Sequence, residues 1–250
     1  MKIIAIVLVA LCLSACGGSS GGSSFSPIST AVAEPAPAET ASPAGIRVEF
    51  DRYVIVGDSI MALSPASLTT AALMLMEEDK PATNISRSGQ AMSSANEDGV
   101  AGAINYLTAH GTGEDNVAVI VELAHNGWFR SSGLDVYYTD YVAFLDGVID
   151  EGEKNIHRFC VVPIASLWDF DYRVNELNES YADLRDTVRQ VAATGKCELI
   201  ETGDWYTESE VFDTTTFLDG LHLGPAGHRI YKDRLMEVLN AYTTPELSAN

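Results

Sequence analysis

Short apolar runs alternate with stretches of helical spacing along most of this 250-residue chain, and this alternation limits what it can fold into. The clearest run, Val-Ala-Val-Ile-Val at 117–121, is typical of a strand that is buried on both faces. Strands that alternate with helices build βαβ units, which give a parallel sheet with helices on both of its sides. The sequence therefore predicts the α/β class, as a three-layer αβα sandwich around a central five-stranded parallel sheet.

These patterns predict the position of each strand and helix. The predicted strands span 52–56, 83–86, 116–123, 156–165 and 197–201, and the predicted helices span 65–78, 97–109, 134–151, 174–193 and 225–242. Ser64 is the expected cap of the first helix, because Pro65 suits a first helical position. A flavodoxin-like strand order is the simplest arrangement, and such sheets bind ligands at the carboxyl ends of their strands.

The first 45 residues are predicted to lie outside the folded domain. Residues 1–15 have the short apolar core of a signal peptide, too short to span a bilayer, which needs roughly 20 apolar residues. The sequence Leu-Ser-Ala-Cys at 13–16 resembles the lipobox of bacterial lipoproteins, which implies cleavage before Cys16 and its acylation. An ordinary secretory signal with an incidental Cys16 is the alternative. No aspartate follows Cys16, which favours an outer-membrane address.

Residues 16–45 then form a tether and residues 46–250 a single domain. The tether is rich in Gly, Ser, Pro and Ala and cannot bury enough apolar surface to fold. The formal charge of −20 for the whole chain argues against nucleic acid or an anionic lipid surface as a partner. It says little about chemistry, and the oligomeric state cannot be read from the sequence.

Two cysteines remain in the predicted domain, Cys160 and Cys197, both on or beside predicted strands. Export would permit a disulfide between them. Two buried free thiols are the alternative.

Ser59 follows the apolar strand at 52–56, so its hydroxyl is expected at the carboxyl edge of the sheet. A serine needs a base to become a nucleophile. Asp219 and His222 are three residues apart, so the carboxylate can hold Nδ1 of the imidazole while Nε2 faces the serine. Ser59 as a simple helix cap, and an incidental histidine in a surface loop, are the structural alternatives. Only the first half of the Gly-x-Ser-x-Gly elbow of α/β-hydrolases is present.

An oxyanion hole needs preorganised hydrogen-bond donors. The backbone N–H groups of Ser59 and Gly89 and the side-chain amide of Asn126 are the candidates, since each follows a predicted strand. Taken singly, Gly89 and Asn126 also fit ordinary turns.

In order and spacing these elements resemble the blocks of the SGNH, or GDSL-type, hydrolase superfamily. Gly-Asp-Ser-Ile at 57–60 has isoleucine where leucine is usual, and Asp-Gly-Leu-His at 219–222 matches the last block fully. The third block, Gly-x-Asn-Asp, is reduced to its asparagine in Ala-His-Asn-Gly at 124–127. The resemblance implies Ser59 as nucleophile, Gly89 and Asn126 as oxyanion donors with the Ser59 N–H, Asp219 as orienting acid and His222 as base.

The altered third block suggests a modified rim on the substrate side, with His125 and Trp128 in place of the usual neighbours. Trp128, Phe129, Trp168, Phe170 and Tyr172 follow strand ends and can form an aromatic wall or merely pack at the rim.

The sequence thus predicts an exported, lipid-anchored serine esterase that acts through an acyl-serine intermediate without metal or organic cofactor. Small esters or O-acyl esters of carbohydrates are the favoured substrates. An O-acyltransferase using the same acyl-enzyme, and a non-catalytic ligand-binding lipoprotein that keeps the fold, are the alternatives.

Overall fold

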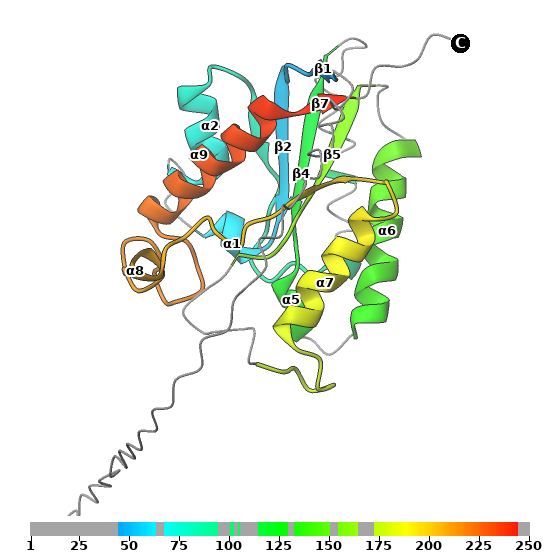
Figure 1. Cartoon of the computed structure of the whole chain (residues 1–250), viewed down its shortest axis with the longest axis vertical. Coiled ribbons are helices and arrows are strands. Elements are labelled where there is room, and N and C mark those ends of the chain that lie inside the picture. The colour runs from blue at the N-terminus through cyan, green and yellow to red at the C-terminus, as the bar shows by residue number, and fades with distance from the viewer. Residues whose placement is uncertain are drawn as a thin grey trace, which may run out of the picture. The chain divides into compact units, whose positions relative to one another are not determined.

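The computed structural model describes residues 45–63, 68–94, 101–102, 105, 115–129, 133–150, 155–164 and 173–244 (Figure 1). All of them lie in one compact unit, Pro43–Asn250. The predicted signal peptide, Cys16 and the tether up to residue 44 lie outside the described residues. Among the residues described, no helix combines the length and the apolar character needed to cross a membrane.

A five-stranded parallel sheet forms the centre of the unit. Its strands are β2 (Arg52–Gly57), β3 (Ala82–Asn84), β4 (Val117–Glu122), β5 (Ile156–Val161) and β6 (Glu198–Ile200). They pair in the order β3-β2-β4-β5-β6, and every pair is parallel. Numbered within the sheet this order is 2-1-3-4-5, the flavodoxin-like arrangement, which confirms the predicted fold class. A separate antiparallel pair joins β1 (Ile46–Arg47) to β7 (Thr243–Thr244).

Helices cover both faces of this sheet. The helices are α1 (Ser59–Ala62), α2 (Thr70–Glu77), α3 (Met92–Ser94), α5 (His125–Phe129), α6 (Leu134–Asp150), α7 (Tyr181–Ala192), α8 (Glu208–Val211) and α9 (Pro225–Ala241). The helices α2 and α9 contact each other on one face, and α6 and α7 contact each other on the other (Figure 1).

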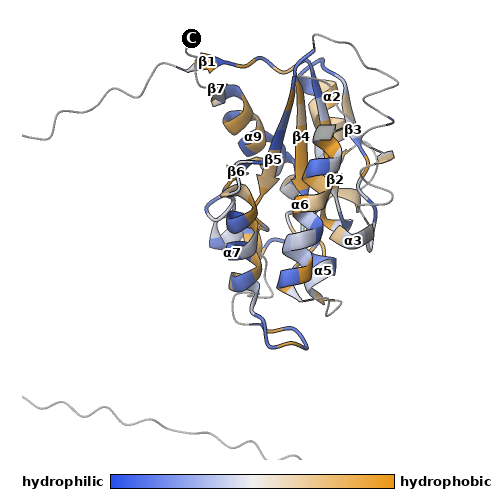
Figure 2. Ribbon diagram, turned by 90° about the vertical axis from the view of Figure 1, so that its right-hand side faces the viewer, coloured by the Kyte–Doolittle hydropathy of each residue, from blue (hydrophilic) through white to orange (hydrophobic). Residues whose placement is uncertain are grey.

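The alternation of side chains along each strand supplies both halves of the core. In β4, Val117, Val119 and Val121 pack with apolar residues of α6 and α7. Ala118 and Ile120 point the other way, toward α2 and α9. The hydrophobic colour accordingly runs along β4, while α7 carries hydrophilic residues on its outer side (Figure 2). A strand buried on both faces explains the unbroken apolar run in the sequence.

Cys160 and Cys197 form a disulfide in the structure and are therefore not free thiols. Cys160 lies in β5 and is fully buried, and Cys197 directly precedes β6. The bridge fastens the edge strand β6 to its neighbour β5, with which it shares only three paired positions.

Two predicted helix starts were wrong. The first helix begins at Thr70, where the hydroxyl of Thr69 accepts the backbone N–H of Ala72 at 3.3 Å. Its expected cap, Ser64, belongs to residues 64–67, which the structure does not describe. The helix predicted from 174 begins only at Tyr181.

The late start of α7 has a local cause. Ser180 and Asp183 form a capping box. The Ser180 hydroxyl oxygen accepts the backbone N–H of Asp183, and the Asp183 carboxylate accepts the backbone N–H of Ser180. Just before it, Asn178 adopts a left-handed conformation with φ of 62°, and Val174 pairs with Ser180 in an antiparallel bridge. Apolar spacing alone could not reveal this turn.

The helix predicted over 97–109 lies mostly outside the described residues, although Ala101, Gly102 and Asn105 are helical. The sequence patterns missed α1, α3, α5 and α8, because each is shorter than two turns and gives too few residues for a period to show.

Candidate active site

Ser59 stands at the carboxyl end of β2, as the first residue of α1. Asp58 is the helix cap, because its Oδ1 accepts the backbone N–H of Ile60 at 2.9 Å. Ser59 is therefore not a capping residue, and its hydroxyl is left to interact across the site. Gly57 is required by close packing: a Cβ there would lie 2.8 Å from the carbonyl oxygen of Glu122.

A hydrogen-bonded chain joins Ser59 to the loop before α9. Nε2 of His222 lies 2.9 Å from Oγ of Ser59, and Nδ1 lies 2.7 Å from Oδ2 of Asp219. An ionised carboxylate only accepts, so Nδ1 carries the proton and Nε2 is free to accept the hydroxyl proton of Ser59. The structure thus brings together the nucleophile, base and orienting acid that the sequence proposed.

The carboxylate of Asp219 is held by its own loop. Its Oδ1 accepts the backbone N–H groups of His222 at 2.9 Å and Leu221 at 3.1 Å. Partial burial opposes ionisation of Asp219, but these bonds and the bond from the His222 ring together lower its pKa. The carboxylate therefore stays charged where it must orient the imidazole.

Close backbone packing sets the shape of this loop. Leu218 donates its N–H to the carbonyl of His222 at 2.8 Å, which closes a tight turn around the acid and the base. Gly220 in this turn has φ of 83°, a left-handed conformation that glycine adopts readily. A Cβ at Gly224 would lie 2.3 Å from the carbonyl oxygen of Thr215, so the backbone just before α9 packs directly against the residues that lead into the loop.

The two other proposed oxyanion donors follow the strands on either side of β2. Gly89 sits in a turn after β3 with φ of 76°, and Asn126 is the second residue of α5, which follows β4. Because β3 and β4 are the neighbours of β2, the three residues follow adjacent strand ends. The side-chain nitrogen of Asn126 is buried and has no hydrogen-bond partner in the described part of the chain. An unpaired buried donor calls for an explanation, and a negatively charged oxygen during reaction is one.

The expected substrate-side rim was wrong for two residues. The side chains of His125 and Trp128 are buried, with 3% and 2% of their surface exposed. The indole N–H of Trp128 donates to the carbonyl of Glu179 at 3.1 Å, so the ring is fixed under the loop before α7. Phe129 is 42% exposed and packs on Trp128, with ring centroids 4.8 Å apart. Trp168, Phe170 and Tyr172 lie outside the described residues.

Three buried polar residues near the site were missed from the sequence: Asp58, Glu122 and Tyr181. Asp58 and Tyr181 lie next to His125, whose Nδ1 is 3.6 Å from Oδ2 of Asp58 and whose Nε2 is hydrogen-bonded to the Tyr181 hydroxyl. Glu122 ends β4 and is completely buried. Its sequence signal is a lone acid that closes a strongly apolar strand, a position that is seldom charged without a partner.

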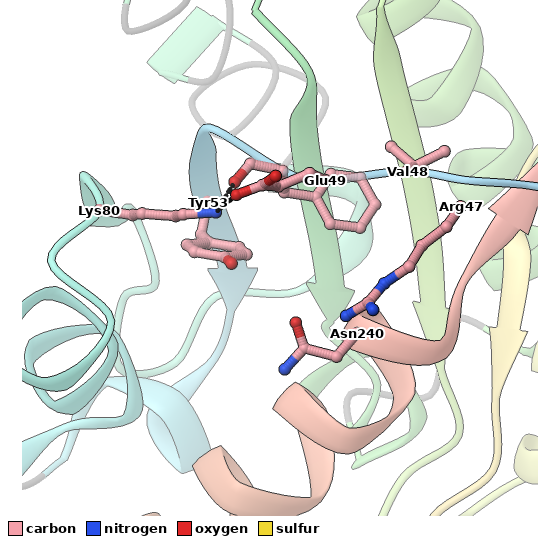
Figure 3. Close-up of a pocket in the computed structure, with 7 residues that line it drawn as sticks. Arg47, Val48, Glu49, Tyr53, Lys80 and Asn240 are labelled. Carbon is pink, nitrogen blue, oxygen red and sulfur yellow. Dashed lines mark hydrogen bonds and ion pairs between the residues drawn. The ribbon is translucent and has the colours of Figure 1, made fainter.

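A cavity of about 340 Å³ lies at the opposite edge of the sheet, near the amino ends of the strands (Figure 3). Its lining includes Tyr53 at the start of β2, Lys80 before β3 and Asn240 near the end of α9. The Lys80 ammonium already donates to the Glu49 carboxylate at 3.2 Å. This cavity is therefore separate from Ser59, which follows the carboxyl end of β2.

Comparison with known proteins agrees with this geometry. A model of the GDSL-like lipase/acylhydrolase family matches residues 55–230, which is more than two thirds of the chain. None of the curated protein sequences matches.

Solved structures share the fold at low sequence identity. A lipolytic protein of the G-D-S-L family from Veillonella parvula has 14% identity and a TM-score of 0.58, with 76% of this chain and 99% of that chain covered. The psychrotrophic esterase EstA from Pseudoalteromonas sp. has 14% identity and a TM-score of 0.53, with coverages of 75% and 95%. The acetyl xylan esterase AlAXEase has 13% identity and a TM-score of 0.52, with coverages of 75% and 98%.

The family match covers both β2 with Ser59 and the loop with Asp219 and His222. The fold is also that of the solved G-D-S-L family protein. This chain therefore belongs to the GDSL-like lipase/acylhydrolase family of ester hydrolases.

Proposed function

We propose that the chain is a serine esterase that hydrolyses carboxylic esters through an acyl-Ser59 intermediate. The hydrogen-bonded chain from Ser59 through His222 to Asp219 is the observation that carries this proposal. Oγ of Ser59 attacks the ester carbonyl carbon while Nε2 of His222 takes its proton. Asp219 keeps the imidazole in the required tautomer and stabilises its positive charge.

The tetrahedral intermediate carries a negative oxygen. In this proposal the backbone N–H groups of Ser59 and Gly89 and the amide of Asn126 donate to it. His222 then protonates the leaving alkoxide, the carbon–oxygen bond breaks and the alcohol departs. A water molecule attacks the acyl-serine with His222 as base, which releases the carboxylic acid and restores Ser59.

Short acyl groups on carbohydrates or small alcohols are the proposed substrates. Asn126 and Phe129 are three residues apart on α5, so their side chains lie on the same side of that helix. The half-exposed ring of Phe129 can therefore offer an apolar surface beside the oxyanion position. The related fold of an acetyl xylan esterase is in keeping with a carbohydrate ester.

We further propose that the protein is exported and anchored to the outer membrane through acylated Cys16. The lipobox-like sequence at 13–16 supports this, and a disulfide between Cys160 and Cys197 suits an oxidising compartment. Replacing Cys16→Ala should move the protein from the membrane fraction to the soluble fraction. Mass spectrometry of the mature amino terminus checks the acylation directly, and an unmodified Cys16 would refute the anchor.

Hydrolysis of p-nitrophenyl acetate, butyrate and longer esters tests the esterase activity. Turnover should be lost in Ser59→Ala, and a fluorophosphonate should label the wild type at Ser59 alone. Ser209→Ala is a matched control, because Ser209 is an exposed serine on α8. Full activity in Ser59→Ala would refute the mechanism. Adding a sugar acceptor separates hydrolysis from acyl transfer, since transfer would yield the acylated sugar.

A further inference from the structure

Asp58 joins the turn that carries Ser59 to a buried network. Its side chain is completely buried, although a carboxylate is costly to remove from water. Oδ1 accepts the N–H of Ile60, which fixes the first turn of α1. Oδ2 faces Nδ1 of His125 at 3.6 Å.

The network continues from His125 to Tyr181. Nε2 of His125 is hydrogen-bonded to the Tyr181 hydroxyl, and that hydroxyl also donates to the carbonyl of Ile164 at 3.4 Å. Tyr181 is fully buried at the start of α7, where its ring packs edge-on against Trp128 with 5.5 Å between centroids. The network therefore links residues that follow β2, β4 and β5.

The tautomer of His125 fixes the direction of these bonds. When the Tyr181 hydroxyl donates its hydrogen to Nε2, Nδ1 carries the ring hydrogen and points it toward Oδ2 of Asp58.

Glu122 does not add a second buried charge to this network. Both of its carboxyl oxygens are buried without a hydrogen-bond partner in the part of the chain that the structure describes. Burial, reinforced by the nearby charge of Asp58, raises the pKa of Glu122 well above its usual range. The neutral form is the one that suits this position.

We propose that Asp58, His125 and Tyr181 form a buried positioning relay that holds the nucleophile and the oxyanion donor in register. Asp58 directly precedes Ser59, and His125 directly precedes Asn126. One contact between Asp58 and His125 therefore sets the distance between two strand ends, and Tyr181 locks it from α7. Figure 1 places α1, α5 and the start of α7 along the same edge of the sheet.

None of the three relay residues is required to touch the substrate, so the relay acts through geometry. A displacement of about 1 Å at reacting groups can lower a rate on the order of 100-fold. Loss of the Tyr181 hydroxyl removes one hydrogen bond from His125 and one from the carbonyl of Ile164, which lets α5 shift. We expect Tyr181→Phe to lower kcat about tenfold with KM unchanged, a smaller loss than that upper range.

Tyr141→Phe is the matched control. Tyr141 is 1% exposed, and its hydroxyl donates to the carbonyl of Val121 at 3.2 Å. Both variants thus remove one buried hydroxyl from a backbone carbonyl near the sheet, but only Tyr181 contacts His125. Their thermal unfolding should be similar, while kcat should fall only in Tyr181→Phe.

A double-mutant cycle with Asn126→Ala separates positioning from general damage. Because the relay acts partly through Asn126, the effect of Tyr181→Phe should shrink at least about threefold in the Asn126→Ala background. Multiplicative effects of the two substitutions, or equal kcat values for Tyr181→Phe and Tyr141→Phe, would overturn the proposal.

The kinetic tests of this proposal rest on the proposed esterase function. A further measurement does not depend on activity. In ¹⁵N NMR of the imidazoles, the Nε2 signal of His125 should move in Tyr181→Phe and stay in Tyr141→Phe. An unchanged signal in Tyr181→Phe would refute the relay even if the enzyme is active. A wild type without esterase activity but with the expected signal change would reject the proposed function and keep the relay.

Discussion

Nε2 of His222 lies 2.9 Å from Oγ of Ser59, although 163 residues separate them in the chain. The parallel sheet makes this contact possible. Ser59 follows β2, and His222 lies just before α9, which packs on one face of the sheet.

Asp219→Asn should lower kcat by about 10³–10⁴ while the fold is kept. The amide would no longer hold Nδ1–H of His222, so the imidazole would adopt the wrong tautomer for a base. Steady-state kinetics with p-nitrophenyl acetate measure the loss. Asp213→Asn is the control, since Asp213 is an exposed acid that caps a turn in the same segment. A loss below tenfold for Asp219→Asn would remove this residue from the mechanism.

Asn126→Ala should lower kcat by about 10²–10³ with little change in KM, because its amide is proposed to donate only in the transition state. Asn240→Ala provides the comparison, since Asn240 lines the cavity at the opposite edge of the sheet. If the Asn126 variant keeps more than a third of the activity, another donor completes the oxyanion hole.

Gly57→Ala should impair both stability and activity. The added Cβ would meet the Glu122 carbonyl oxygen at 2.8 Å and Cγ of Met61 at 2.9 Å, so β2 must shift from β4. Overpacking of this kind costs about 1–3 kcal/mol in the free energy of unfolding. Gly203→Ala has no atom within 4 Å of the new Cβ and should behave as wild type. Urea unfolding of both variants decides the matter, and equal midpoints would contradict the predicted clash.

Acid should destabilise the protein through His228. This residue is fully buried on α9, with Nδ1 3.0 Å from the Thr70 hydroxyl, and burial lowers its pKa from 6.5 to about 4. The unfolded chain binds a proton below pH 6.5 and the folded protein does not. Stability is therefore lost as the pH falls from 6.5 to about 4, by about 3 kcal/mol in all.

His228→Gln removes this titration and serves as the comparison. Urea unfolding at pH 7 and pH 4 should show a smaller loss in the variant than in the wild type. The same loss in both proteins would show that other groups cause the acid sensitivity.

Removing the disulfide should lower the free energy of unfolding by roughly 4 kcal/mol, because the bridge closes a loop of 37 residues in the unfolded chain. The variant Cys160→Ala with Cys197→Ala tests this by urea unfolding, and a reducing agent should destabilise only the wild type. The activity of the folded protein should stay within about twofold, since Cys160 lies in β5, two strands from β2, and Cys197 precedes the edge strand β6.

The fold could be predicted because strand and helix periods differ so clearly here. The run at 117–121 is apolar throughout, whereas α7 shows apolar residues only on one side. Helix starts were harder to predict. The apolar spacing before Tyr181 suits a helix, but the left-handed turn at Asn178 prevents one from forming there. Capping contacts depend on three or four residues and are easily hidden within a longer pattern.

The candidate site likewise contains residues that the sequence predicted and a residue that it placed wrongly. Gly-Asp-Ser at 57–59 and Asp-x-x-His at 219–222 suggested their partnership, because each motif holds several chemical groups at fixed spacing. The burial of His125 could not be foreseen, since it depends on Tyr181, a residue 56 positions further along the chain. A histidine beside a proposed oxyanion donor was therefore expected at the rim, and its side chain is buried instead.

The pairing of β1 with β7 has a practical consequence for attachment. Ile46 lies beside Thr244, so both ends of the described chain leave the sheet at its amino edge (Figure 1). Ser59 and His222 occupy the other edge. A surface, a resin or a fused partner joined directly at Ile46 or Thr244 would thus lie at the edge of the sheet opposite Ser59 and leave the nucleophile facing outward.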